Sequence, residues 1–397
     1  MSHLGYIEKL LDGVEVEWKL LWQVTIWDKK FNAVERDKQP RVIKYHYFLA
    51  KDLKSLAIEN GNVKLLTTNL SNLWTSEELA GEKVSEGEVI AIPWGGNPVV
   101  QYYKGKFLTT DNRIATSADT DLLNNKFLYY YLLSQIDLIS SFYRGSGIKH
   151  PSMYDVLHIS IPIPPIHIQT EIVRILDTFT ELTAELTAEL TARQQQYAYY
   201  RDELLTFEEG EVEWKTLGDI AENLDSKRKP ISSSLREPGD IPYYGASGIV
   251  DYVKDYIFDG DYLLVSEDGA NLVARSTPIA FSISGKNWVN NHAHVLKFET
   301  YAERKYVEYF LNSIDLTPYI SGAAQPKLNQ KNLNSIKIPN PSLEEKERIV
   351  SILDKFDALT TSLTEGLPRE IELRQQQYEY YRDLLLSFPK PEVESHD

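Results

Sequence analysis

The chain has 397 residues, too many for one ordinary core, and its 42% hydrophobic and 25% charged residues are typical of a globular protein of two or three domains. It contains no cysteine, which excludes a disulfide scaffold, a thiolate metal site and a cysteine nucleophile. The net charge of −16 disfavours unaided DNA binding, because phosphate contacts need Lys and Arg. The first six residues lack the basic and apolar regions of a signal peptide, and no apolar run reaches the roughly 18 residues that cross a bilayer, so we expect a cytoplasmic protein.

A variable block over about 18–155 precedes a long predicted helix over 165–207. We expect 1–155 to form one domain of mixed α/β structure and 156–210 to form a central helical region. Apolar residues of the helix follow the i, i+3, i+4 pattern of one buried stripe, and about 43 residues span roughly 64 Å. Within the helix, 180–192 contains a Thr-Ala-Glu-Leu repeat, whose four-residue unit adds about 6 Å and turns the face by about 40°. A chance low-complexity helix is the other interpretation of this repeat.

The second half of the chain repeats segments of the first. The repeated pieces are Val-Glu-Trp-Lys (16–19 and 212–215), Ile-Pro-x-Pro (161–164 and 338–341), Ile-Val-x-Ile-Leu-Asp-x-Phe (172–179 and 349–356) and Arg-Gln-Gln-Gln-Tyr (193–197 and 374–378). The variable blocks between them share little beyond their edges, which indicates one scaffold that presents two different surfaces. A duplicated enzyme domain with one decayed copy is the alternative.

A second domain is therefore expected over 211–340, followed by a second helical region over 341–397. Its helix, 342–388, begins with a capping box formed by Ser342 and Glu345, and Gly366 and Pro368 predict a break. Both long helices carry more acidic than basic residues, so we expect them to pack on each other or on partner proteins and not along phosphates. The residues expected in this pairing are Leu182, Leu186, Leu190, Ile352, Phe356 and Leu359.

The Ile-Pro-x-Pro segments, the paired Arg-Gln-Gln-Gln-Tyr blocks and the tetrapeptide repeat together resemble the specificity subunits (HsdS) of Type I restriction-modification systems, nearest to the group with Thr-Ala-Glu-Leu repeats in the central conserved region. In the second block, 241–248, 265–270 and 290–294 also resemble the recognition domains of this family. The first block departs from the family pattern, with Trp94-Gly95-Gly96-Asn97 where a Glu-Asp-Gly element would fall.

This resemblance implies an α+β fold with a pseudo-two-fold internal repeat, in which two target-recognition domains are separated by two long helices that form an antiparallel coiled coil. Each domain would read one half of a split target in double-stranded DNA, and the helices would fix the gap. Two methyltransferase subunits that carry S-adenosylmethionine would dock on the repeats and methylate adenine, and two motor-nuclease subunits can join for cleavage that uses ATP and Mg. The chain itself would be non-catalytic and would bind no cofactor and no membrane.

Direct readout needs side chains that reach base edges, such as Arg or Lys for guanine and Asn or Gln for adenine. In the first block the candidate DNA-binding residues are Trp94, Gly96, Asn97, Asn112, Arg113, Arg144, Lys149 and His150. In the second block they are Lys227, Arg228, Lys229, Tyr244, Ser247, Arg275, Asn291, Gln325 and Lys327. A locally basic stretch over 29–44 is expected to hold phosphates. For any single residue, a solvated surface position is the competing interpretation.

His292 and His294 would share one face of a strand, and structural roles are favoured over a metal pair because no third ligand has the expected spacing. The sequence has no phosphate-binding loop, no Asn/Asp-Pro-Pro-Tyr motif and no hydrolase or protease motif. Two alternatives stay open. One is a nuclease or DNA methyltransferase with an unrecognised motif, and the other is a coiled-coil scaffold that does not touch DNA.

Overall fold

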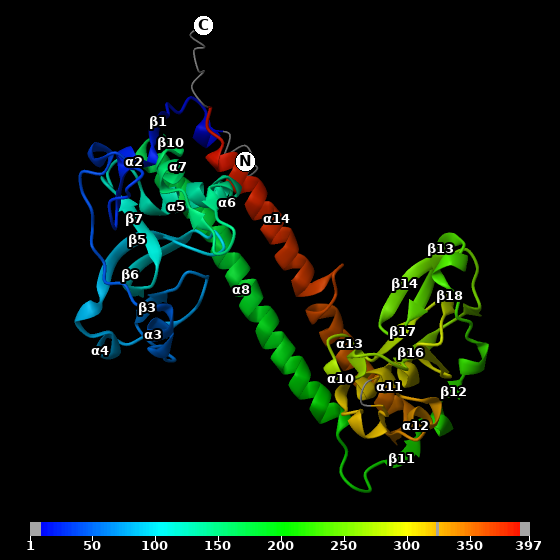
Figure 1. The fold of residues 1–397 in the computed structure, drawn as a ribbon. Coiled ribbons are helices and arrows are strands. Elements are labelled where there is room, and N and C mark those ends of the chain that lie inside the picture. The colour runs from blue at the N-terminus through cyan, green and yellow to red at the C-terminus, as the bar shows by residue number, and fades with distance from the viewer. Residues whose placement is uncertain (1–8, 323–324, 390–397) are drawn as a thin grey trace. The chain divides into compact units, whose positions relative to one another are not determined.

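The computed structural model describes residues 9–322 and 325–389 and divides into two compact units. The first unit is Met1–Glu185 with Glu372–Asp397, and the second is Leu186–Ile371. Each unit combines β-sheets with helices (Figure 1). In the part of the chain that is described, no helix has the length and apolar character needed to cross a membrane.

The first unit is built on a six-stranded sheet with the order β2-β7-β5-β6-β3-β4. The pairs are antiparallel except β3 with β6, which are parallel. The strands are β2 (Thr25–Trp27), β7 (Asn112–Ser117), β5 (Ser85–Pro93), β6 (Gln101–Thr109), β3 (Val63–Leu66) and β4 (Trp74–Thr75). Two further strand pairs are β1 (Glu17–Leu20) with β10 (Ser160–Ile163) and β8 (Tyr143–Arg144) with β9 (His150–Pro151).

The helices of the first unit are α2 (Leu21–Val24), α3 (Ala50–Ser55), α4 (Glu77–Ala80), α5 (Asn125–Ser134), α6 (Ile136–Ser141) and α7 (Met153–Leu157). The main core lies between the sheet and these helices, and it includes Phe127 and Leu128 of α5 with Ile90 and Ile92 of β5. The first part of α8 (Ile166–Leu205) and the end of α14 (Gly366–Leu386) add apolar residues to the same core.

The second unit has two four-stranded sheets. One has the order β12-β19-β16-β17, with β12 (Glu222–Asn223), β19 (Ala293–Lys297), β16 (Tyr262–Ser266) and β17 (Ala280–Ile283). The other has the order β14-β13-β18-β15, with β14 (Gly248–Val253), β13 (Pro238–Gly245), β18 (Lys286–Val289) and β15 (Phe258–Asp259). Strand β11 (Glu213–Thr216) pairs with β20 (Lys337–Asn340).

The helices of the second unit are α9 (Leu217–Ile220), α10 (Asn271–Ala274), α11 (Tyr301–Ser313), α12 (Gln330–Asn334) and α13 (Leu343–Thr360). Its main core joins α11 to β16, and residues of α13 such as Ile349 and Leu353 are fully buried in it. The helical structure is interrupted between α13 and α14, and Gly366 at the start of α14 has a φ of 76°. This break confirms the interruption that Gly366 and Pro368 predict.

Equivalent contacts recur in the two units and give the sequence repeat a structural meaning. Trp18 faces Pro162 between β1 and β10, and Trp214 faces Pro339 between β11 and β20. The Tyr130 hydroxyl donates to Asp177 at 2.6 Å, and the Tyr309 hydroxyl donates to Asp354 at 2.6 Å. The joint between domain and helix is therefore the same structure twice.

Helix pairing is also repeated. In the first unit Phe179 of α8 stacks on Tyr381 of α14, with ring centroids 5.4 Å apart. In the second unit Phe356 of α13 stacks on Tyr200 of α8 at 5.8 Å. Leu182, Leu186 and Leu190 are half-buried along α8. A coiled coil over the full length of the helices stays a prediction.

Candidate nucleic-acid interface

An equivalent turn follows one strand in each unit, β5 in the first and β16 in the second, although the residues of the two turns differ. After β5, the Trp94 amide donates to the Asp111 carbonyl at 2.9 Å, and after β16 the Glu267 amide donates to the His292 carbonyl at 2.9 Å. Trp94-Gly95-Gly96 thus takes the place of Glu267-Asp268-Gly269. The third residue is left-handed in both units, with a φ of 99° at Gly96 and 103° at Gly269, a conformation that favours glycine.

A second loop lies against this turn in each unit. The Gly96 amide donates to the Lys149 carbonyl at 3.0 Å, and the Gly269 amide donates to the Pro326 carbonyl at 3.2 Å. In the first unit this loop is closed by β8 and β9, where Arg144 faces His150, and in the second unit Ser321 faces Lys327. We call the turn and the loop together the loop edge, which comprises 94–97 and 144–150 in the first unit and 267–270, 290–292 and 325–327 in the second.

In each unit a buried carboxylate binds the main chain of a strand next to the loop edge. Asp28, directly after β2, accepts the Ile114 amide at 2.9 Å, and Asp225, directly after β12 and Leu224, accepts the Val295 amide at 2.9 Å. Burial raises the pKa of Asp28 despite its bond from the Tyr47 hydroxyl. Burial also acts to raise the pKa of Asp225, but the hydrogen bonds from His294 and Val295 and the nearby Arg228 charge together outweigh it and hold that pKa below its usual 3.8.

A basic side chain precedes the strand residue that binds each carboxylate. In the first unit it is Arg113, whose guanidinium lies 4.3 Å from the centre of the Trp94 ring and 3.0 Å from Asp111. In the second unit it is His294, 2.6 Å from Asp225. The sequence did not identify Asp28 or Asp225 as functional, and the available signal was an acidic residue one or two positions after a short strand.

Several cations on the surface of the two units are exposed and form no ion pair. Among the residues that the structure describes, no salt bridge is formed by Lys30, Arg36, Arg41, Lys44, Lys149, Lys227 or Lys229, and all seven are exposed. Lys29 lies 5.8 Å from the Trp94 ring, and its pKa is lowered by partial burial and by the Arg113 charge. This acidic chain thus offers exposed cations for phosphate contacts, and one of them, Lys149, belongs to the first loop edge itself.

Most first-block candidates fall on the loop edge. Trp94, Gly96 and Asn97 form the turn, and Arg144, Lys149 and His150 form the adjacent loop, where the His150 ring lies 5.3 Å from Trp94. Asn112 and Arg113 are different, because both are buried. Asn112 donates to the Leu66 carbonyl at 3.0 Å, and Arg113 is held by Asp111 and the Trp94 ring. These two support the edge, so we leave them out of the proposed base contacts.

Some second-block candidates are linked through strand β13. The Asn290 amide donates to the Tyr244 carbonyl at 3.1 Å, which joins Tyr244 to the segment that contains Asn291. Lys227, Lys229, Gln325 and Lys327 are exposed. Glu267 pairs with Arg228 at 2.6 Å and with Lys327 at 3.0 Å. Arg275 donates to the carbonyls of Asn312 and Ile314 at the end of α11, so its side chain is committed there and is not a base-contact candidate.

Asp225, Glu267 and His294 place their ligand atoms within 4.8 Å of one another, which invites a test for a metal site. Arg228 lies 3.3 Å from Asp225 and 2.6 Å from Glu267, and Lys327 lies 3.0 Å from Glu267. Both His294 nitrogens are also occupied, by Asp225 at 2.6 Å and by the Leu328 carbonyl at 2.7 Å. Protein cations already balance these carboxylates, so the donor set does not fit a metal ion.

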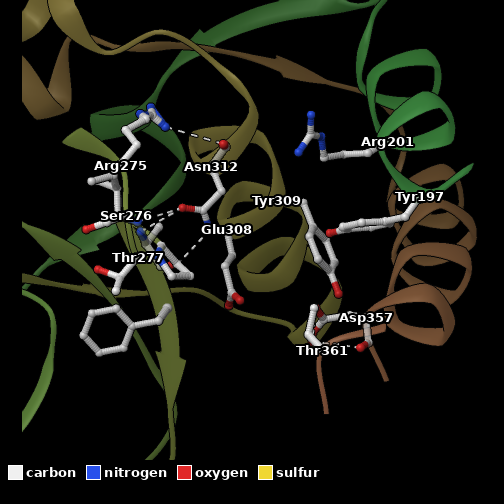
Figure 2. A pocket seen from close by; sticks show the side chains of 14 residues that line it. Tyr197, Arg201, Arg275, Ser276, Thr277, Glu308, Tyr309, Asn312, Asp357 and Thr361 are labelled. Atoms are coloured by element: carbon white, nitrogen blue, oxygen red, sulfur yellow. Dashed lines mark hydrogen bonds between the residues drawn. The ribbon is translucent and has the colours of Figure 1, made fainter. Parts of the chain in front are cut away.

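A cavity of about 470 Å³ lies in the second unit between α8, α11, α13 and the segment 275–281 (Figure 2). Its polar groups are bonded to neighbours. Glu308 accepts from Lys305 at 2.6 Å, and Tyr309 is bonded to Asp354, which together with burial raises the pKa of the Tyr309 hydroxyl. Side chains committed in this way are typical of a joint between helices and not of a reaction centre.

Comparison with known proteins decides the family. The family described as "Type I restriction modification DNA specificity domain" matches residues 44–193 and 209–373. The chain belongs to this family. It is therefore a non-catalytic, DNA-recognising specificity subunit of a Type I restriction-modification system, and the enzyme and DNA-free scaffold alternatives are not favoured.

Full-length relatives agree with this assignment. The chain is 38% identical to the Type I restriction enzyme EcoR124I/EcoR124II specificity subunit of Escherichia coli, over 100% of both chains. It is 34% identical to a putative Type I restriction enzyme specificity subunit of Haemophilus influenzae, over 96% of this chain and 98% of that one. The crystal structure of the Type I S subunit from M. genitalium shares the fold, with a TM-score of 0.65 and 18% identity over 96% of this chain and 98% of that chain.

Proposed function

We propose that each unit reads one half of a bipartite DNA target through its own loop edge, and that α8 and the second helical region set the spacing between the halves. The observation that carries this proposal is that the two units share the backbone of the turn but differ in the side chains on it. Backbone hydrogen bonds build the same turn in both units, whereas the side chains that the turn carries are those of half-buried Trp94 and exposed Asn97 in one unit and that of half-buried Asp268 in the other. Two unlike readers on one frame suit two unlike half-targets.

The exposed cations supply sequence-independent contacts to phosphate, and the edge residues supply sequence readout. First-unit readers are Trp94, Gly96, Asn97, Arg144, Lys149 and His150, and second-unit readers are Lys227, Lys229, Tyr244, Ser247, Asn291, Gln325 and Lys327. Arg228 acts by holding Glu267 in place.

We also assign the docking of two methyltransferase subunits to the repeated tyrosine blocks of the helices. Tyr199 is 64% exposed and Tyr380 is 57% exposed, and each lies next to a tyrosine that packs on the partner helix, Tyr200 and Tyr381. Large exposed aromatic side chains on a rigid base are typical binding hot spots. The partners would bring S-adenosylmethionine for adenine methylation, and a restriction partner would bring ATP and Mg, in the cytoplasm.

The test is an exchange of blocks. Residues 214–336 are replaced by the corresponding block of another family member, and the modified adenines are mapped by sequencing in a host that carries the chain and its methyltransferase. We expect one half of the methylated target to change and the other to remain. The same exchange of residues 18–155 should change the other half. A target that stays the same in both experiments contradicts the proposal.

A further inference from the structure

His294 joins three separate segments in and beside the second loop edge, although its own side chain is fully buried. Its Nδ1 lies 2.6 Å from Asp225, which begins the short helix η3 (Asp225–Lys227). Its Nε2 lies 2.7 Å from the Leu328 carbonyl, next to Lys327. Glu267 of the turn is 3.8 Å away.

Both nitrogens of the ring face hydrogen-bond acceptors. A neutral imidazole has one donor and one acceptor nitrogen, whereas an ionised carboxylate and a carbonyl both only accept. The ring satisfies both partners at once only when it donates from both nitrogens.

The other charges around His294 complete a closed network. From η3 and its end come Asp225 and Arg228, from the turn after β16 comes Glu267, and from the loop before α12 comes Lys327. Burial acts to raise the pKa of Glu267, but its bonds from Arg228 and Lys327 hold it below its usual 4.5. Each carboxylate is thus shared by cations from different segments, and moving one segment breaks bonds to the others.

The first unit has a different cation in the same place. Arg113 holds the position of His294, because each directly precedes the strand residue whose amide binds the buried carboxylate. Trp94 holds the position of Glu267, so the Arg113 guanidinium contacts an aromatic face where His294 faces a carboxylate. The same backbone arrangement is therefore supported by a guanidinium–aromatic contact in the first unit and by an imidazole–carboxylate contact in the second.

We propose that Arg113 and His294 are positioning residues, each of which fixes the loop edge of its own unit and thereby controls discrimination at one half of the target. This inference rests on the proposed division of the target between the units. According to this inference, neither Arg113 nor His294 contacts DNA directly. The loss of a buried charge-assisted bond is expected to weaken discrimination by about ten-fold or more.

The test uses the full-length chain in complex with its methyltransferase. His294→Gln keeps a donor but removes the charge, and Arg113→Met keeps the stem over Trp94 but removes the charge. For each complex, methylation is measured on the correct duplex and on duplexes with single base changes in either half. We expect His294→Gln to lower discrimination about ten-fold in the half assigned to 214–336 by block exchange, and Arg113→Met to do so only in the other half.

Unchanged discrimination in both halves, or equal loss in both, overturns the inference. Failure of the block exchange itself refutes the proposed function instead, so the two failures are distinguishable. If His294→Gln does not fold, Asp225→Asn tests the same tie with nearly unchanged volume and carries the same expectation. Nitrogen NMR of the imidazole in the wild-type complex gives an independent readout. Two protonated nitrogens on His294 at neutral pH support the inference, and a neutral tautomer overturns it.

Discussion

Replacement of Gly96 by alanine separates the geometry of the turn from its chemistry. A Cβ at Gly96 meets no atom within 4 Å, so the substitution causes no clash. The backbone φ of 99° is the only obstacle, because an L side chain rarely adopts it. Strain of this kind costs about 1–3 kcal/mol, which corresponds to a factor of about 5 to 150 in an equilibrium.

The strain can be relieved in two ways, and both are measurable. If the turn keeps its conformation, the free energy of unfolding falls by the full 1–3 kcal/mol. If the turn moves, the bond from the Gly96 amide to Lys149 breaks and the edge residues shift. In that case methylation of targets altered in one half rises relative to the correct target. Thermal unfolding and methylation of single-base variants, measured on the same complex, distinguish the two outcomes.

Gly87→Ala is the matched control. It makes the same chemical change in the same unit, at a position in β5 without a left-handed φ, where the nearest atom to the new Cβ is Val89 Cγ1 at 3.8 Å. We expect it to be neutral or slightly stabilising. Gly269→Ala, with a φ of 103°, should repeat the Gly96→Ala effect at the other half-target. If Gly96→Ala and Gly87→Ala behave alike in both assays, the turn does not position the readers.

Three further predictions test other parts of the molecule. The lowered pKa of Glu267 means that the carboxylate stabilises the fold above pH 4.5 and that this contribution is lost as the pH falls through the pKa of the folded state. The difference in the free energy of unfolding between wild type and Glu267→Gln, measured with denaturant, should therefore be largest near pH 7 and shrink below pH 4.5. A difference that does not change with pH contradicts the ion network. Deletion of Thr187-Ala188-Glu189-Leu190 from α8 removes about 6 Å of helix and should shorten the mapped gap between half-targets by about one or two base pairs; an unchanged gap refutes the spacing role. Tyr199→Ser or Tyr380→Ser should weaken methyltransferase binding about ten-fold in a titration, whereas Tyr256→Ser, which removes a comparably exposed tyrosine, should not; equal effects would mean that the blocks do not dock the partner.

The repeats allow much of the fold to be predicted from the sequence. Segments that recur as Ile-Pro-x-Pro and Ile-Leu-Asp-x-Phe become equivalent strands and helices, and Asp177 and Asp354 even bind equivalent tyrosines. Long helices are predictable because their apolar period is local to the sequence. The break before Gly366 follows from a backbone preference, which is also local.

The support of the loop edge could not be predicted, because it joins residues far apart in the chain. Asn112 and Arg113 look like surface polar residues, but β7 is a central strand and its side chains are buried on both faces. Trp94-Gly95-Gly96 and Glu267-Asp268-Gly269 share only their last residue, so their equivalence is visible only in the hydrogen bonds of the turn. Arg275 is diverted by the end of α11, which the sequence places almost forty residues later.

The division between frame and tips explains how one scaffold can present unlike surfaces. The bonds that define the turn come from main-chain groups, namely the amides of residues 94 and 96 in one unit and of 267 and 269 in the other. Main-chain bonds do not depend on side-chain identity, so Trp94 and Glu267 can differ without a change of turn. Their different side chains then require different support beneath them. A guanidinium against an aromatic ring and an imidazole beside a carboxylate both meet this need. The supporting side chains therefore differ between the units together with the side chains of the turn, while the main chain of the turn stays the same.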